Sequence, residues 1–355
     1  VLPALLPLLL LLLFAGSVVR VDGLSTPFAT TRARLLIQDT RNSGWTRSGG
    51  TVQTGPRMQF AEIKFYDNSD TEIQIASCTN VKPGTIIGVT AAENIAKSCD
   101  NNIQTKFVME FRDDGDNPPG RWAEIEYVFS SAAIVSKYLL YSANDFDLRD
   151  PSQWMVLVKV STDAQVTGDW VAIHRNTDVA NFPTQRTTAT AKFAVSYEQE
   201  VYRLHIVSSR SATNMQIGEI DWFLSGTAGG AKTIPTTLYS GNDLQGPDNY
   251  YREGAQSLSA GSAQYKWYAN SLAVDVVMTW PRKSLLTNYQ IFTANDAAER
   301  DPRTWYIYRL KDDQTWELLD TKTNAMGSTS RLSGWNKFAL DRTPECSCLW
   351  SKGFN

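Results

Sequence analysis

One stretch of the chain is written twice. "ANDFDLRDPSQW" and "ANDAAERDPRTW" share seven residues, each recurring 151 positions later, from Ala143 and Ala294 to Trp154 and Trp305. A separation of this size is the length of an ordinary domain. The constant offset therefore predicts two copies of one domain.

A second pair of matching segments has a different spacing. "RLLI…MQFAEIKFY" covers 34–66, and "RLHI…MQIGEIDWF" covers 203–223. We interpret the first copy as the opening strands of domain one and the second copy as its closing strands. No third copy follows, so we expect domain two to lack its last strands.

Most of the remaining chain consists of short runs rich in Val, Ile, Tyr, Phe and Trp. "AEIEYVFS", "MVLVKVST" and "VYRLHIVSS" are examples, and Gly, Asn, Asp, Pro or Ser separates the runs. Many short strands with turn signals between them predict an all-β fold. We expect two tandem β-sandwiches of the jelly-roll kind.

The expected boundaries follow from these repeats. Domain one is predicted over 26–225, the Gly-rich stretch 226–235 is predicted to be a linker, and a truncated domain two is predicted over 236–355. Residues 1–23, "VLPALLPLLLLLLFAGSVVRVDG", resemble a signal peptide that lacks its initiator Met and basic segment. The protein is therefore expected to be secreted, with an uncleaved membrane anchor as the alternative.

Composition limits the classes of function. Hydrophobic residues make up 42% and charged residues 20%, which is typical of globular domains, and the net charge is −3. No dense run of Lys or Arg offers a surface for nucleic acid. His174 and His205 are the two histidines, and neither lies in a nucleophile motif. We expect a binding protein rather than an enzyme.

Taken together, these motifs resemble the discoidin family, whose members are also called coagulation-factor type C domains or galactose-binding-like jelly rolls. The segments are "SANDFDLRDPSQWMVLVKVSTD", "GDWVAIHRNTD", "FPTQR", "KFAV" and "MQIGEIDWF", which follow the order of that family. The family's Asp-Gly before the second Trp is altered in both copies. The resemblance covers most of residues 30–340.

The resemblance implies ligand binding, in particular glycan binding, through loops at one end of the sandwich. Sugar recognition needs an aromatic platform beside planar hydrogen-bonding groups. The candidate ligand-binding residues in domain one are Arg121, Trp122, Asn144, Asp145 and Arg149. For the last three, a structural turn is an equally open interpretation. For Asp150 and its neighbours Pro151 and Trp154, we favour a structural corner.

The resemblance also implies a structural calcium ion in domain one only. "CDNNIQTKF" matches the family's calcium loop at Asp100, Asn102 and Thr105, and Glu219 is the matching late carboxylate. These groups supply the oxygen ligands that calcium prefers. Asn101 replaces a family Gly, so a hydrogen-bonded turn without an ion is the alternative. The aligned stretch of domain two, 260–267, has no acidic residue.

Two cysteines, Cys78 and Cys99, lie within domain one. Because the chain begins like a secreted protein, we expect a disulfide between them rather than two buried thiols.

Two other functions remain open for the whole chain. The first is that of an accessory binding region of a larger glycoside-active enzyme. The second is that of a module for adhesion to extracellular protein or a lipid surface.

Overall fold

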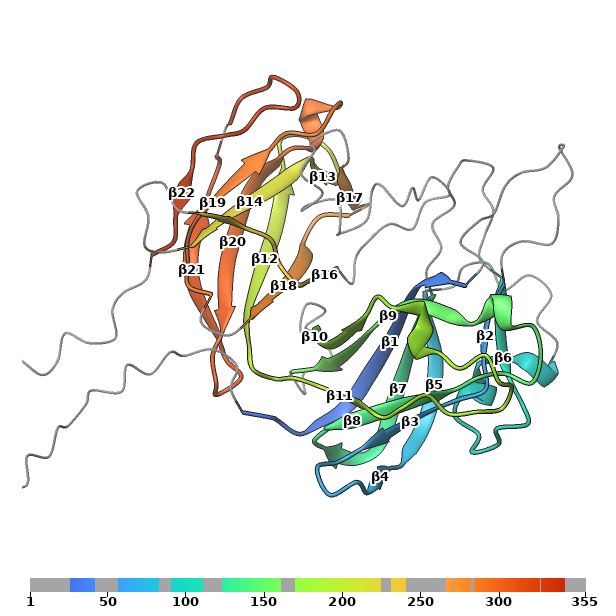
Figure 1. Cartoon of the computed structure of the whole chain (residues 1–355). Coiled ribbons are helices and arrows are strands. Elements are labelled where there is room, and N and C mark those ends of the chain that lie inside the picture. The colour runs from blue at the N-terminus through green and yellow to red at the C-terminus, as the bar shows by residue number, and fades with distance from the viewer. Residues whose placement is uncertain are drawn as a thin grey trace, which may run out of the picture.

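The computed structural model describes most of the chain between residues 26 and 341 (Figure 1). The described ranges are 26–41, 57–82, 91–110, 123–160, 170–224, 231–240, 266–269, 271–281, 284–325 and 327–341. Within them the regular elements are β-strands and short 3-10 turns. The predicted all-β sandwich fold is confirmed.

The first sandwich contains the strands β1 to β11. Its larger sheet has the order β10-β9-β1-β7-β5, its smaller sheet has the order β11-β8-β3-β4, and β2 pairs with β6. The strands are β1 (Thr30–Thr40), β2 (Arg57–Phe60), β3 (Glu62–Tyr66), β4 (Glu72–Ile73), β5 (Ile75–Lys82), β6 (Phe107–Glu110), β7 (Ala123–Ala133), β8 (Lys137–Tyr141), β9 (Pro151–Lys159), β10 (Trp170–Asn176) and β11 (Phe193–Ala194).

The second sandwich repeats this topology strand for strand. Its sheets have the orders β21-β20-β12-β18-β16, β22-β19-β14-β15 and β13-β17. The strands are β12 (Gln199–Ser209), β13 (Met215–Ile217), β14 (Glu219–Leu224), β15 (Lys232–Thr233), β16 (Thr237–Tyr239), β17 (Trp267–Ala269), β18 (Val274–Pro281), β19 (Leu286–Phe292), β20 (Pro302–Leu310), β21 (Trp316–Lys322) and β22 (Phe338–Ala339).

This topology corrects the predicted domain boundaries. β12 and β14, which were expected to close domain one, pair with β18, β20 and β19 of the second sandwich. The boundary therefore lies between β11 and β12, not at 226–235. Within that expected linker, β15 pairs with β14 of the same sandwich. The prediction of a truncated domain two is wrong, because every strand of the first sandwich has a counterpart in the second.

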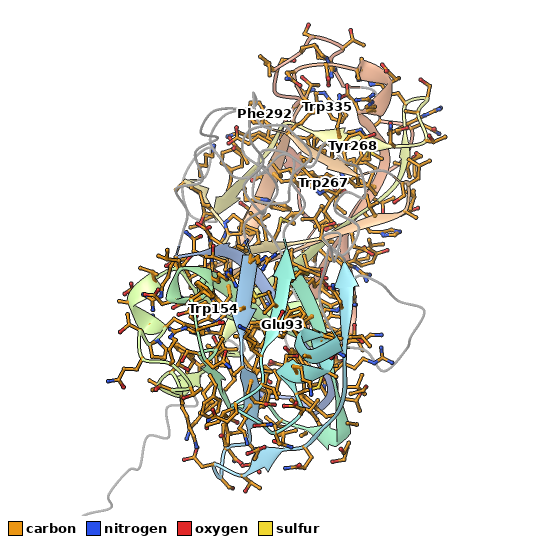
Figure 2. The ribbon with its side chains drawn as sticks, turned by 90° about the vertical axis from the view of Figure 1, so that its right-hand side faces the viewer. Glu93, Trp154, Trp267, Tyr268, Phe292 and Trp335 are labelled. Atoms are coloured by element: carbon orange, nitrogen blue, oxygen red, sulfur yellow. A yellow bond between two sulfur atoms is a disulfide. The ribbon has the colours of Figure 1, made fainter. Side chains whose placement is uncertain are left out.

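Alternation along the strands places one face of each larger sheet in a core. In β9, Trp154, Val156 and Val158 belong to the core cluster of the first sandwich. Trp305 and Ile307 occupy the matching positions of β20 in the second core. Both tryptophans are 0% exposed, and Trp154 lies inside the first sandwich (Figure 2). The repeated Trp is therefore a core residue, as predicted.

The two sandwiches meet through their larger sheets. Tyr239 of β16 packs in a buried cluster with residues of β1, β9 and β10. Its hydroxyl donates a hydrogen bond to the Glu124 carboxylate (2.6 Å) and accepts one from the Arg34 guanidinium (2.7 Å). In Figure 1, β10 lies beside β16 and β18. The phenol of one sandwich thus occupies a polar site in the sheet of the other.

Candidate ligand-binding corner and the adjoining loop

The repeated stretch forms a corner between β8 and β9, and a buried ion pair fixes it. Asp150 is 0% exposed. Its carboxylate accepts two hydrogen bonds from the Arg186 guanidinium (2.9 and 2.6 Å), and Arg41 Nε lies 3.5 Å away. A bidentate pair of this kind satisfies a charge that burial would otherwise make costly. The interpretation of Asp150 as a structural residue is confirmed.

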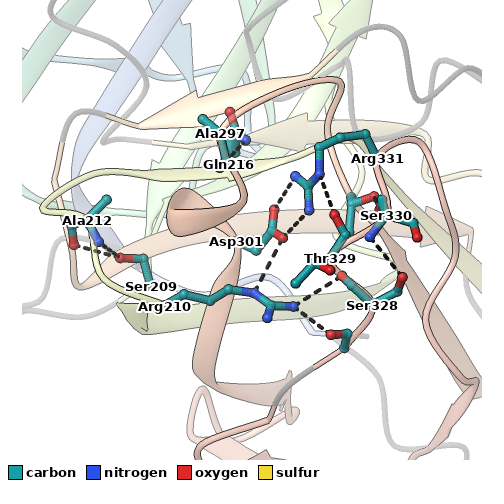
Figure 3. Close-up of polar contacts among 12 residues, drawn as sticks. Ser209, Arg210, Ala212, Gln216, Ala297, Asp301, Ser328, Thr329, Ser330 and Arg331 are labelled. Atoms are coloured by element: carbon teal, nitrogen blue, oxygen red, sulfur yellow. Dashed lines mark hydrogen bonds and ion pairs between the residues drawn. The ribbon is translucent and has the colours of Figure 1, made fainter.

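The second sandwich has the same device, drawn in Figure 3. Arg331 donates to both carboxylate oxygens of Asp301 (2.9 and 2.5 Å), and Arg210 Nε lies 3.5 Å from that carboxylate. Arg331 precedes the last strand of its sandwich, and Arg210 follows the first strand. Both are far from Asp301 in sequence. Their recurrence in the two copies was the available signal for this role.

A buried glutamine holds the outer part of each corner. Gln59 on β2 donates its side-chain amide to the carbonyls of Asp145 and Phe146. Gln216 on β13 does the same for Asp296 and Ala297 (2.5 and 2.9 Å). The Met-Gln dipeptide shared by the two strand pairs therefore supports the repeated loop. The sequence showed the repetition but not its target.

The outermost part of the first corner carries an exposed aromatic ring. Phe146 has φ 37°, its side chain is 61% exposed, and Leu148 is 57% exposed. The Arg149 guanidinium carbon lies 4.2 Å from the centre of the Phe146 ring. Arg149 therefore covers part of the ring, and the rest of the ring faces solvent.

The outermost positions are where the two copies differ. Ala297 takes the place of Phe146 with nearly the same backbone (φ 43°), and Glu299 takes the place of Leu148. A positive φ costs energy for a residue with a β-carbon, and both corners tolerate it. Both corners thus have the same ion pair and glutamine contacts, while the exposed apolar side chains belong to the first sandwich.

The predicted ligand-binding residues have different environments. Asn144 is exposed, and its amide lies 3.5 Å from the Gln104 carbonyl. Asp145 accepts a hydrogen bond from the Lys106 ammonium (2.5 Å). Asn144, Asp145 and Arg149 lie on one corner, whereas Arg121 and Trp122 fall outside the described residues.

The ion pair of Asp145 also recurs in the second sandwich. Lys266 donates to both oxygens of Asp296 (3.1 and 3.0 Å). A contact present in both copies is better explained as support for the corner than as ligand recognition by Asp145.

The predicted calcium loop lies in the first sandwich, but its late carboxylate is not Glu219. The Asn102 N–H donates to both the Asp100 carboxylate (3.0 Å) and the Glu62 carboxylate (3.1 Å). Glu219, on β14 of the second sandwich, instead accepts a hydrogen bond from Lys232 (2.8 Å). The Glu-Ile strand lies in the opening strand pair of each sandwich. The carboxylate beside Asp100 is therefore Glu62 of the first sandwich, not Glu219 of the second.

The polar groups of this loop bond to one another. Asn101 adopts φ 58°, the left-handed conformation that the family's Gly would supply. The Thr105 hydroxyl lies 2.8 Å from the Asn102 carbonyl oxygen and 3.0 and 2.9 Å from the two Asp100 carboxylate oxygens. Lys97 donates to the outer oxygen of Asp100 (3.1 Å).

Burial changes the acid–base behaviour of this loop. It raises the pKa of the Glu62 carboxyl to about 7, and the nearby Asp100 adds to that rise while the N–H groups of Asn101 and Asn102 oppose it. Over the described ranges, no group of three or more His, Cys, Asp or Glu side chains is arranged to hold a metal. Any metal here would depend on carbonyl and hydroxyl oxygens as well.

A disulfide ties this loop to the sheet. Cys99 directly precedes Asp100, and its sulfur lies 2.05 Å from that of Cys78 on β5. The Cα atoms are 6.5 Å apart, within the range for a bridge. The predicted pairing is confirmed.

Comparison of the chain with known proteins gives no match. No family profile fits the chain, and no curated protein or solved structure is significantly similar to it. The resemblance to the discoidin family therefore rests on the motifs quoted above. Among the described residues, no helix is long and apolar enough to span a membrane.

Proposed function

We propose that the chain is a carbohydrate-binding protein that takes its ligand on the outer corner of the first sandwich, and that it acts without catalysis. The observation that carries the proposal is the Phe146 ring, 61% exposed on a corner that Arg186, Asp150 and Gln59 hold in place. A ring fixed in this way loses little entropy when a ligand covers it.

The chemistry around the ring suits a sugar. The face of an aromatic ring packs against the C–H groups of a pyranose, while planar polar groups bond its hydroxyls. Asn144 supplies an exposed amide, and Arg149 supplies a guanidinium 4.2 Å from the ring centre. Asp145 supports the corner through Lys106.

A glycan array followed by titration of the strongest glycan tests the proposal. We expect the full chain to bind a defined set of glycans, and Phe146→Ala to weaken that binding about tenfold or more. Ile134→Ala is the matched control. Ile134 is 38% exposed and lies at the other end of β1, since Ala133 pairs with Thr30 whereas Pro151 pairs with Thr40. No glycan binding, or equal loss in both variants, would contradict the proposal.

Leu148 favours a second candidate function. It is 57% exposed two residues from Phe146, and paired apolar side chains on a protruding corner suit insertion into a lipid surface. Vesicle co-sedimentation distinguishes the two functions. Leu148→Ala should weaken vesicle binding while leaving glycan binding unchanged.

We also propose that calcium stabilises the first sandwich. Asp100, Thr105 and the carbonyl of Asn102 would contribute ligands, with Glu62 replacing the expected Glu219. Calcium when bound would supply positive charge between two neighbouring carboxylates. Asp100→Ala should abolish the rise in Tm of the full chain between chelator and millimolar calcium. Asp313→Ala, an exposed aspartate of the second sandwich, is the control.

The pH dependence of calcium binding offers a separate check. Because the pKa of Glu62 is about 7 and calcium needs the ionised form, we expect affinity to rise between pH 6 and pH 8. Calorimetry should show proton uptake by the buffer on binding, and Glu62→Gln should remove it. A Tm that stays constant from chelator to millimolar calcium would contradict the calcium proposal.

Secretion is part of the same proposal. The Cys78–Cys99 disulfide supports an oxidising compartment, as does the signal-like segment of the sequence.

A further inference from the structure

The first sandwich contacts the second through five residues on the outer face of its larger sheet. These residues surround Tyr239 of the second sandwich in one buried cluster and are between 0% and 7% exposed. The residues are Leu36, Met155, Leu157, Trp170 and Ala172.

The second sandwich has large side chains at the same five positions. Strand pairing fixes the correspondence, because Leu157 pairs with Ala172 as Tyr308 pairs with Leu318. The counterparts lie on β12, β20 and β21, and we call them the outer patch. They are His205, Tyr306, Tyr308, Trp316 and Leu318.

The outer patch is more exposed than its counterpart, although its Trp316 is half-buried and packs against the core cluster of the first sandwich. Leu318 is 50% exposed, whereas Ala172 is 3% exposed. Tyr306 and Tyr308 are half-buried, whereas Met155 and Leu157 are 0% exposed. Tyr306 stacks on His205 with ring centres 6.1 Å apart. A flat aromatic and aliphatic sheet face of this kind is typical of a protein–protein interface.

Charges beside the outer patch are balanced. His205 Nδ1 lies 2.9 Å from the Asp275 carboxylate, and Arg203 Nε lies 3.8 Å from the same carboxylate. The Arg203 guanidinium carbon lies 4.6 Å from the ring centres of Tyr308 and Trp316. Without an excess of one sign, the patch does not repel a second patch of the same composition.

The outer patch is also continuous with the contact between the sandwiches. Strand pairing places Tyr239, Val277, Arg203, Tyr308 and Leu318 in one row across the sheet. The first part of this row, Tyr239 and Val277, packs against the first sandwich. The last part lies on β20 and β21, away from β10 in Figure 1.

We infer that the outer patch pairs two copies of this chain face to face about a two-fold axis. The positions are those that this fold already uses to dock sheet on sheet within one chain. An isologous contact needs a self-complementary surface, and aromatic rings with balanced charges provide one. The occupant is the same patch of a second chain.

Sedimentation velocity on the full chain between about 1 and 100 µM tests this inference. We expect the wild type to form a dimer within this range. Leu318→Glu should place an unpaired carboxylate in the contact and weaken dimerisation more than about tenfold. Val179→Glu is the matched control, because Val179 is 41% exposed on the first sandwich.

Each outcome decides the inference. A dimer that Leu318→Glu disrupts and Val179→Glu preserves, with unchanged melting temperatures, supports it. A monomer up to about 100 µM, or a dimer that Leu318→Glu leaves intact, overturns it. Assemblies that grow beyond a dimer with concentration indicate a head-to-tail contact and overturn the two-fold arrangement.

Discussion

Trp154, Tyr138 and His174 form a buried chain of hydrogen bonds that ends on the histidine. Trp154 Nε1–H donates to the Tyr138 hydroxyl (2.7 Å), so the tyrosine proton points to His174 Nδ1 (2.7 Å). His174 therefore accepts with Nδ1 and is neutral. Burial lowers the pKa of His174, which agrees with that role.

This geometry predicts a pH effect on stability. The pKa of His174 is lower in the folded state than its unfolded value of about 6.5, so the unfolded state binds more protons as the pH falls. The contribution of His174 to the free energy of unfolding is full above pH 6.5 and is lost as the pH falls through the folded pKa.

Chemical denaturation of the wild type and of His174→Gln at pH 5 to 8 measures this contribution of His174 to the free energy of unfolding. We expect the wild type to lose more stability than the variant on acidification. Parallel profiles would contradict the assignment. In the second sandwich, Trp305 and Tyr289 form the same chain, which ends on Asp320 (2.6 Å) instead of a histidine.

At the scale of elements, each corner depends on an arginine from a distant segment. Removing one partner of a buried ion pair leaves the other charge without compensation, at a cost of about 3–5 kcal/mol. Arg186→Ala should therefore destabilise the first sandwich by this amount, and Arg331→Ala the second. Arg32→Ala should cost less than about 1 kcal/mol, because the Arg32 side chain is 41% exposed and its partner Glu126 keeps an ion pair with Arg34 (2.7 Å).

Urea denaturation measures these changes. Arg186→Lys should recover little of the loss, since an ammonium cannot bond both oxygens of Asp150 in the planar geometry of a guanidinium. If Arg32→Ala and Arg186→Ala cost the same, the ion pair does not fix the corner.

At the scale of the whole molecule, the apolar contact between the two sandwiches encloses a group of polar side chains. Glu124 is 0% exposed and accepts from Arg34 and from Tyr239 of the other sandwich. Tyr239→Phe should remove a hydrogen bond to a buried charge and cost about 1.5–3 kcal/mol.

Calorimetry tests whether this contact couples the sandwiches. We expect one melting transition for the wild type and two for Tyr239→Ala. Tyr127→Phe is the control, because the Tyr127 hydroxyl bonds Ser98 within the first sandwich (3.3 Å). Two transitions in the wild type would show that the sandwiches unfold independently.

The sequence by itself determined the features that arise from local chemistry and from repetition. Alternating apolar residues and turn signals predicted strands, and the repeat predicted two copies of one β-sandwich. Trp154 was assigned to the core, Asp150 to a corner, and Cys78 to a bridge with Cys99. Each of these assignments depends on residue type and on neighbours in sequence.

Only the tertiary structure decided which strands belong together. β12 has the same sequence pattern whether it closes the first sandwich or opens the second, because its own residues do not specify its partners. The assignment of Glu219 to the calcium loop failed for that reason, and Glu62 took its place. Strand pairing joins segments far apart in the chain, and its free energy depends on both partners and on the core they bury.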